Sequence, residues 1–547
     1  MSETGQSAAP KRAIGVVGLT FIAVSGVIGS GWLFAPLFAA QEAGPASILS
    51  WVLGGFMILI PALAFAEIAA MLPVMGGIGR LPQFSHGSTV GMMIGWAAWV
   101  GYVTAAPIET QALLEYVSNE EMFAWIFVDI GETGQNPLSL PGIAVAFCLL
   151  VIFTFLNFFG VRLFTRINSG LTWFKIAVPL IAAIALLMNF DSAAIDETGF
   201  APEGAEGVLA AVASGGVIFA FLGFRHALDM AREAERPQRT VPIALIGSIL
   251  LCMVLFVLVQ IGFVGAVTAE QVSDGWPALT FSNANGPIAA MLAGLGLAVV
   301  ANLVLADAVV GPFGAALVAS ASTSRLTVAV SRNGLFPDFL QKMSARGVPA
   351  RALVLNAFVG MGILLVFRNG WQEILAFNSG AIVLSFCAGP IALLALRRQL
   401  PGYRRPFRLP LANLIGSAGF VVVGLIIYWT GWDVLWKLAL PLAAGLLLLI
   451  IRSARHPDIR ATLDLRQAAW LPPYVVGLLL ISWLGNFGGG LGIIPFGWDM
   501  LIVAVFSLGI LALAVHLRLP AEQVEAYLTD DRADDLSPVE GTATPSP

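Results

Sequence analysis

Glycine and serine interrupt the first long apolar segment of the chain between Ser25 and Gly31. Three glycines among these seven residues free backbone N–H and C=O groups that a regular helix would bond internally. Inside a bilayer such groups are tolerated only where they face protein or a water-filled cavity. The segment therefore predicts a binding site for a small polar solute, and transport is the first hypothesis.

A second interruption lies five apolar segments later, in an apolar stretch that contains Gly215, Gly216 and Gly223. The charges of the loops, described below, make this segment run opposite to the first. Interrupted helices of opposite orientation are typical of inverted-repeat transporters, whose site lies where the repeats meet. The alternative is that these glycines only allow helices to pack closely.

Composition places the whole chain in a membrane. Its 547 residues are 58% hydrophobic and 11% charged, and the mean hydropathy is +0.87. The net charge of -5 excludes a nucleic-acid-binding protein. Cys148, Cys252 and Cys387 lie in apolar stretches and are interpreted as buried hydrophobic residues. The sequence lacks a phosphate-binding loop, a Ser/His/Asp arrangement and a metal motif, so neither an enzyme nor a bound metal or cofactor is expected.

Hydrophobicity predicts about fourteen membrane-spanning helices, at about 20 residues per crossing. The predicted segments are 14–40, 46–72, 88–117, 140–160, 168–189, 207–231, 241–267, 286–311, 350–368, 371–396, 410–430, 433–452, 471–486 and 496–518.

Every second connection between these segments is rich in arginine, whereas the alternate ones are acidic or neutral. The positive-inside rule then places the N-terminus, with Lys11 and Arg12, in the cytoplasm. An even number of spans brings the C-terminus to the same side. The expected location is the cytoplasmic membrane, with a cytoplasmic tail at residues 1–12 and a disordered cytoplasmic tail at residues 520–547.

Several motifs resemble the amino acid-polyamine-organocation (APC) permeases. They are residues 25–32 (SGVIGSGW), 66–73 (AEIAAMLP), 219–224 (FAFLGF), 235–237 (ERP), 324–325 (SR) and 331–337 (SRNGLFP). The resemblance implies an all-α polytopic fold with a LeuT-like five-plus-five inverted repeat at residues 13–400. About four additional transmembrane helices would follow at residues 401–519.

The resemblance also implies where an amino acid would bind. Its carboxylate would meet the backbone N–H groups of the first interruption, where the resuming helix presents the positive end of its dipole. The residues concerned are Ser25, Gly26, Val27, Gly29, Ser30 and Gly31. Its ammonium would meet carbonyl groups of the second interruption, at Phe219, Ala220, Phe221 and Leu222.

Arg225 departs from the family, whose members commonly carry an acidic residue at this position. A guanidinium beside the ammonium subsite would repel a cationic side chain and could bind a second carboxylate. This favours aspartate or glutamate and suggests similarity to the bacterial aspartate-proton symporters. The alternative is that Arg225 lines a cytoplasmic vestibule with neighbouring arginines.

Lys175 lies inside the fifth apolar segment. An ammonium there is costly unless it is paired or functional, and burial favours the loss of its proton. The resemblance implies that Lys175 takes the place of the sodium ion of LeuT-like relatives and couples transport to protons. The alternative is that its side chain snorkels to the inner interface.

Together these observations predict a secondary transporter for amino acids that takes up its substrate with protons and leans towards acidic amino acids. An amino acid exchanger and a non-transporting membrane sensor are the alternatives. The sequence also names Glu67, Glu109, Asp229 and Asp307 as buried charges, and His226 as a candidate for pH sensitivity.

Overall fold

The protein is built from α-helices, as the computed structural model shows for residues 14–118, 121–128, 137–281, 286–367 and 371–536. Within these ranges there is no β-sheet, and two isolated bridges join Ile14 to Ala234 and Phe127 to Leu138. The predicted all-α polytopic fold is confirmed. The expected N-terminal tail, residues 1–12, lies outside the described residues.

The chain forms its helices in the following order. The first half contains α1 (Val16–Val27), α2 (Gly31–Ala43), α3 (Ser47–Met71), α4 (Gly77–Val117), α5 (Leu140–Asn157), α6 (Val161–Leu187), α7 (Ala193–Thr198), α8 (Gly204–Ala213), α9 (Val217–Phe221), α10 (His226–Asp229) and α11 (Pro237–Gly265). The second half contains α12 (Pro287–Gly294), α13 (Ala298–Arg332), α14 (Ala350–Val366), α15 (Trp371–Ser385), α16 (Ala388–Gln399), α17 (Ala412–Trp429), α18 (Trp432–Arg455), α19 (Pro457–Ala461), α20 (Leu465–Ala468), α21 (Leu471–Leu484), α22 (Trp498–His516) and α23 (Ala521–Leu536).

Eleven helices in the described ranges are long and apolar enough to cross a membrane, or twelve if the bent pair formed by α8 and α9–α10 is one span. Each of the fourteen predicted segments contains a helix. The described ranges have fewer spans than the fourteen predicted, for two reasons. Helices α2 and α3 form one continuous stretch (Gly31–Met71), and α14 is shorter than a full span. The chain is a multi-pass membrane protein.

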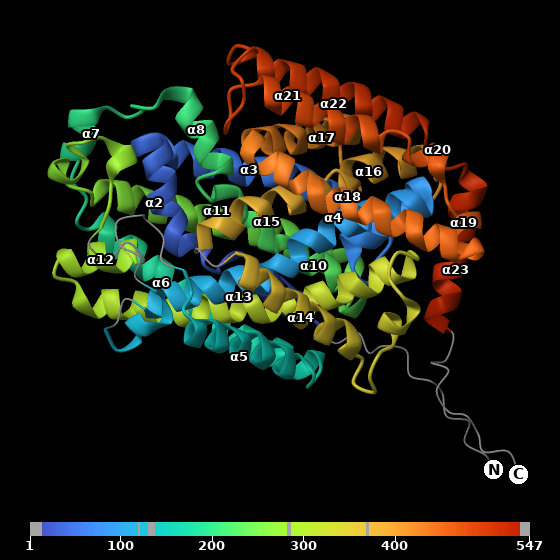
Figure 1. Ribbon diagram of the computed structural model, residues 1–547, viewed down its shortest axis with the longest axis horizontal. Helices are drawn as coiled ribbons and strands as arrows, with labels where there is room; N and C mark the ends of the chain where they lie inside the picture. Colours follow the sequence, from blue (N-terminus) through green and yellow to red (C-terminus); the bar gives the residue numbers. More distant parts are fainter. Residues whose placement is uncertain (1–13, 119–120, 129–136, 282–285, 368–370, 537–547) are drawn as a thin grey trace, which may run out of the picture.

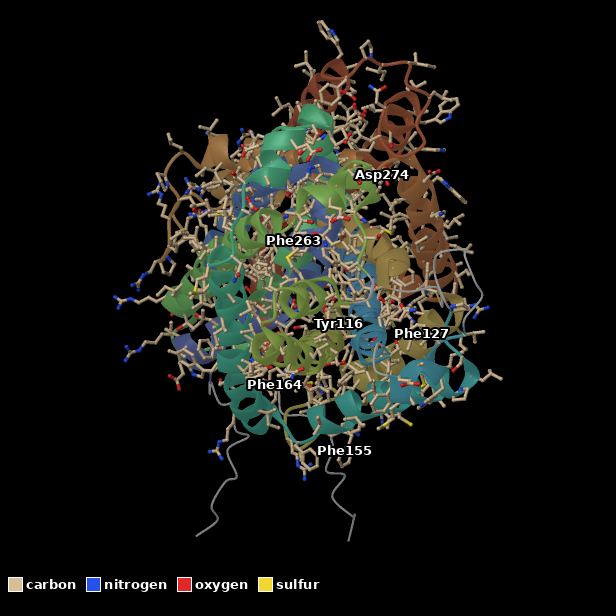
Figure 2. The ribbon with its side chains drawn as sticks, turned by 90° about the vertical axis from the view of Figure 1, so that its left-hand side faces the viewer. Tyr116, Phe127, Phe155, Phe164, Phe263 and Asp274 are labelled. Carbon is tan, nitrogen blue, oxygen red and sulfur yellow. The ribbon has the colours of Figure 1, made fainter. Side chains whose placement is uncertain are left out.

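Large apolar side chains cover the outside of the bundle. Phe155, Phe358 and Val505 are 57%, 68% and 62% exposed, and Figure 2 shows Phe155 pointing outward. Such residues are stable at a surface only where lipid acyl chains cover them. The polar residues of the helices instead gather inside the bundle, around the interrupted helices.

The long helices α4 and α13 pack against each other through the middle of the molecule, while α5 lies at one edge and α21 and α22 lie at the opposite edge, beside α17 (Figure 1). Four of the candidate spans lie beyond residue 400, as predicted for the C-terminal part. They include α22, which packs on α17.

Helix α4 is kinked at Gly87, whose φ of 85° and ψ of -177° are accessible to glycine. The side chain of Asp464 fills the space that a Cβ at Gly87 would need. Its carboxylate accepts hydrogen bonds from the Ser88 N–H at 2.9 Å and from the Tyr527 hydroxyl at 2.9 Å. The C-terminal region is thereby tied to the kink of α4.

The prediction of a disordered tail at residues 520–547 is wrong for residues 521–536, which form α23. Val524 and Leu528 of this helix are buried, and Tyr527 binds Asp464. The prediction failed because it relied on the acidic composition and on the lack of a broad apolar face. Two apolar residues one turn apart are enough to dock this helix. Residues 537–547 lie outside the described residues.

We expect Tyr527→Phe to loosen α23. Burial, and then the charge of Asp464, raises the pKa of Tyr527 to about 12 from its usual value near 10, so its hydrogen bond stabilises the docked helix below pH 10 and is lost as the pH rises towards 12. Losing about 1 kcal/mol should speed hydrogen exchange of the α23 amides about fivefold at neutral pH. Thr529→Ala, which alters an exposed hydroxyl bonded within α23, is the control. Equal exchange in all three proteins would contradict this assignment.

Candidate substrate site

The first interruption separates α1 from α2. Helix α1 ends at Val27, and α2 begins at Gly31. Between them the Ile28 N–H still bonds the Val24 carbonyl at 2.8 Å, but the Ser30 N–H points to a side chain. The predicted break of the first apolar segment is therefore present at Ile28, Gly29 and Ser30.

The second interruption has two parts. Helix α8 ends at Ala213, and the chain bends by 43° before it continues as α9 and α10. Gly216, with φ of 83°, begins α9. A 3-10 turn, η3 (Leu222–Arg225), then joins α9 to α10. The glycines at 215, 216 and 223 thus lie at two separate irregularities rather than in one unwound stretch.

The two interrupted helices touch through their backbones. A Cβ on Gly223 would overlap the Gly26 carbonyl group and the Val27 nitrogen. A Cβ on Gly31 would lie 2.9 Å from the Cβ of Ala220, too close for a normal contact. Here the glycines allow close packing, and they also bring the two breaks to one place.

A cavity of about 350 Å³, including the space at its mouth, lies between the two breaks. Its walls come from α1, α9, η3, α10, α4, α13 and α15. The predicted residues among them are Gly26, Val27, Phe219, Leu222 and Arg225, and the others include Glu109, His226, Ala315 and Asn378. The structure thus brings residues from distant parts of the sequence around one enclosed space.

Glu109 of α4 occupies the donor that was expected to bind a substrate carboxylate. Its Oε2 accepts a hydrogen bond from the Ser30 N–H at 2.8 Å, and its side chain fills the space beside Gly29. Ser30 is the residue before α2, where free N–H groups and the helix dipole favour an anion. The sequence marked Glu109 as a buried charge but gave no sign of this contact.

Lys175 of α6 is fully buried and does not snorkel to an interface. Its Nζ donates to the Ser25 carbonyl at 2.5 Å and to the Ser25 hydroxyl at 3.0 Å, at the last turn of α1. Its charge interacts with those of Asp307 and Glu109. Lys175 therefore holds the end of α1 from one side of the first break.

Arg225 is 4% exposed and lines the cavity instead of an open vestibule. Its Nη1 donates to the Leu222 carbonyl at 2.7 Å, and its guanidinium lies 4.5 Å from the centre of the Tyr102 ring. The Tyr102 hydroxyl in turn donates to Asp229 at 3.3 Å. In the described residues Arg225 has no ion pair with a carboxylate, and its buried Nε has no hydrogen-bond partner.

Aromatic rings cover the cavity near α2 and α15. The Trp371 ring meets the Phe219 ring edge-on, with centroids 5.5 Å apart, and its Nε1 donates to the Ser30 hydroxyl at 2.7 Å. Phe221, in contrast, packs away from the cavity against Trp51. The Phe219 carbonyl accepts from the backbone N–H of Leu222, so it is already paired in this conformation.

Beyond η3, an ion pair joins the chain after α10 to α13. Arg325 of α13 binds both carboxylate oxygens of Glu233, at 2.7 and 3.1 Å. Closer to the cavity, the His226 ring contacts Gly26 and bonds Ser322 at 2.8 Å. Polar contacts therefore tie α10 and the residues after it to α13.

Two further acidic residues from the sequence analysis have separate roles. Asp307 accepts a hydrogen bond from Trp32 at 3.0 Å, and its other oxygen is buried without a partner. Glu67 pairs with Arg397 and Arg405 at 2.6 and 3.4 Å, among residues that do not line the cavity. Glu67 is structural, whereas Asp307 links α13 to α2.

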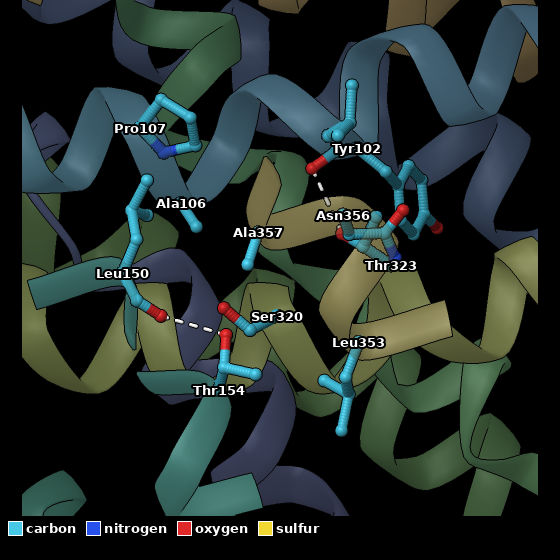
Figure 3. Close-up of a pocket in the computed structure, with 11 residues that line it drawn as sticks. Tyr102, Ala106, Pro107, Leu150, Thr154, Ser320, Thr323, Leu353, Asn356 and Ala357 are labelled. Atoms are coloured by element: carbon cyan, nitrogen blue, oxygen red, sulfur yellow. Dashed lines mark hydrogen bonds between the residues drawn. The ribbon is translucent and has the colours of Figure 1, made fainter. Parts of the chain in front are cut away.

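A second cavity, of about 320 Å³ with the space at its mouth, lies on the other side of Tyr102 (Figure 3). Thr154 and Thr323 line it, and their hydroxyls donate to the carbonyls of Leu150 and Tyr102 at 2.8 and 3.0 Å. Its walls carry no charged side chain. It contains neither Arg225 nor any residue of the two breaks.

The geometry described so far is that of a cavity between two interrupted helices inside a helical membrane protein. A model of the family described as amino acid permease matches residues 14–439. The chain belongs to this family. The match includes both interruptions, Lys175 and Arg225, and it ends within α18, so α19 to α23 lie beyond it.

Among curated relatives of this permease, the glutamate/serine transporter AimA of Bacillus subtilis is 35% identical over 505 residues, which cover 91% of this chain and 92% of the relative. The aspartate-proton symporter of the same species is 35% identical over 520 residues, covering 94% and 98%. Its methylthioribose transporter is 26% identical over 468 residues, covering 83% and 96%. The predicted family is confirmed.

We expect Gly223→Ala to weaken amino acid binding by this permease. The added methyl group meets backbone atoms of Gly26 and Val27, which cannot rotate away, and overpacking of this kind costs about 1 to 3 kcal/mol. Equilibrium binding of radiolabelled amino acids should weaken about tenfold or more. Gly247→Ala is the matched control, because nothing lies within 4 Å of a Cβ there. A Gly223→Ala protein that binds as tightly as the control would refute the tight contact.

Proposed function

We propose that this permease takes up acidic amino acids together with protons and is not an enzyme. The substrate would lie in the cavity between the two breaks, where it contacts both interrupted helices. Alternating access would then consist of movements of these helices around the bound substrate.

The observation that carries this proposal is the burial of Arg225 in the cavity wall without a carboxylate partner among the described residues. A buried guanidinium is costly unless an anion or several hydrogen bonds compensate it. Its Nη1 has a carbonyl partner, but its Nε has none. The side-chain carboxylate of aspartate or glutamate would supply the missing acceptor.

The names of two relatives agree with this substrate class. One is a glutamate/serine transporter and the other is an aspartate-proton symporter, and each is 35% identical to this chain over more than nine-tenths of its length. This similarity supports an acidic substrate and coupling to protons. The substrate is therefore proposed as a class, the acidic amino acids.

The remaining groups of the substrate would use the breaks. We assign its α-carboxylate to N–H groups at Ser30 and Gly31 and to the neighbouring backbone of Gly26, Val27 and Gly29. Its ammonium would use backbone carbonyls around Phe219, Ala220, Phe221 and Leu222.

Lys175 is the proposed coupling residue. Its ammonium bonds Ser25 at the end of α1, where a change of charge would alter the hold of α6 on the interrupted helix. Coupling requires that protonation favours one conformation over another. The contact between Lys175 on α6 and Ser25 on α1 would do so if it forms in one conformation and breaks in the other. A lysine in this place removes the need for sodium.

We further propose that the protein lies in the cytoplasmic membrane with both termini in the cytoplasm, as the arginine-rich connections indicate. Residues 13–400 would form the ten-helix transport core. Residues 401–519 would add the four following spans.

Arg225→Ala should weaken uptake of aspartate and glutamate at least about thirtyfold, because it removes one partner of a buried charge pair. Uptake of serine should change only a few-fold, since serine has no side-chain carboxylate. Initial rates in proteoliposomes measure both. Arg239→Ala, an exposed arginine of the same basic region, is the control. Equal losses for acidic and neutral substrates would remove the specificity role of Arg225.

Lys175→Ala should abolish accumulation driven by an inward proton gradient in sodium-free buffer, while exchange across the membrane is retained. The reason is that exchange needs both conformations but no net proton transfer. Uptake with and without the gradient, and counterflow of labelled substrate, separate the two activities. Lys437→Ala, on α18, is the control. Strict sodium dependence, or gradient-driven accumulation by Lys175→Ala, would reject this residue as the coupling site.

A further inference from the structure

A cavity of about 880 Å³, including the space at its mouth, lies away from the candidate substrate site. It is formed where α16, α20, α22 and the start of α23 meet. Its walls are polar and basic. They include Arg398, Gln399, Arg466, Gln467, His516 and Arg518, and we call this space the basic cavity.

The ends of three candidate membrane spans meet at the basic cavity. The spans Phe377–Gln399 and Trp498–His516 end there, and the span Leu465–Leu484 begins there. The end of an apolar span lies near the boundary between acyl chains and headgroups. The basic cavity is therefore at the depth of lipid phosphates.

The three arginines of the basic cavity come from different elements and are not neutralised. In the part of the chain that the structure describes, Arg398, Arg466 and Arg518 form no ion pair with a carboxylate. Arg518 donates one hydrogen bond, to the Val515 carbonyl at 2.8 Å, which leaves its other donors available. Three converging guanidiniums suit a phosphate better than a single carboxylate, because a phosphate offers more acceptor oxygens.

Gln399 adds a buried polar group to this wall. Its Nε2 donates to the carbonyls of Ser85 and Leu519, at 2.9 and 2.8 Å, and these two bonds fix the orientation of the amide. Its Oε1 is buried and has no partner, and the residue is 6% exposed. Gln399 is therefore a fixed part of the cavity wall, and the arginines are left to bind a ligand.

The geometry points to a binding site for a phosphate ester, namely the headgroup of an anionic phospholipid. Leu465, beside Arg466, is 63% exposed, and Leu513, one turn before His516, is 38% exposed. These apolar surfaces next to the basic cavity favour a ligand with acyl chains over a soluble phosphate. Since Gln399 also joins the kinked part of α4 to the segment before α23, the ligand would stabilise the docking of the C-terminal region.

The test uses delipidated full-length protein in detergent and three probes: dioctanoyl phosphatidylglycerol, dioctanoyl phosphatidylcholine and inorganic phosphate. Native mass spectrometry measures lipid binding, and thermal unfolding measures the effect of phosphate. The pocket variant is Arg466→Gln/Arg518→Gln, and the control is Arg455→Gln/Arg460→Gln, two exposed arginines outside the basic cavity. Arg398→Gln, from a different helix, provides a second variant if the first does not fold.

We expect phosphatidylglycerol to bind more tightly than phosphatidylcholine, and the pocket variant to weaken it about twentyfold, at about fivefold for each arginine. The control should bind as the wild type does. Stabilisation by inorganic phosphate that is lost in the pocket variant, without any preference for phosphatidylglycerol, would assign the same site to a soluble phosphate. Unchanged binding of phosphatidylglycerol together with an unchanged effect of inorganic phosphate in the pocket variants would overturn the proposal.

Discussion

The backbone contact between Gly26 and Gly223 is the constraint on which the rest of the site depends. Neither position has room for a Cβ, so the end of α1 and the turn η3 approach more closely than side chains normally allow. This contact brings two breaks, nearly 200 residues apart in the chain, to opposite walls of one cavity. Because no side chain separates the two backbones here, any movement of α1 also changes its contact with η3.

Charged side chains satisfy the backbone groups that the breaks leave free. Lys175 donates to the Ser25 carbonyl, Glu109 accepts from the Ser30 N–H, and Arg225 donates to the Leu222 carbonyl. In a bilayer each of these groups would otherwise cost several kcal/mol. The residues that satisfy the backbone at the breaks are therefore charged, which explains why Lys175, Glu109 and Arg225 are buried beside the interruptions.

The sequence predicted the parts of this structure that have local causes. The glycines at 26, 29 and 31 predicted a break, and the long apolar runs predicted the helices. Lys175 was identified because it lies within an apolar segment. It could not reveal that Glu109 meets Ser30 or that Trp371 covers Phe219, because these contacts join residues far apart and depend on how α4 and α15 pack. The helix α23 was missed for the same reason: Tyr527 is held by Asp464, which no pattern within the tail could show.

In the proposed binding mode, Glu109 would make substrate binding and helix position interdependent. Its carboxylate already holds the Ser30 N–H at the start of α2, so a substrate carboxylate can reach this donor only when Glu109 gives it up. The displaced side chain projects from α4, which also carries Tyr102 beneath the Arg225 guanidinium. A ligand that replaces contacts between α2 and α4 with contacts of its own changes the relative free energies of their arrangements. In the proposed mechanism, this contact between one carboxylate and one backbone N–H would supply the difference between conformations that alternating access requires.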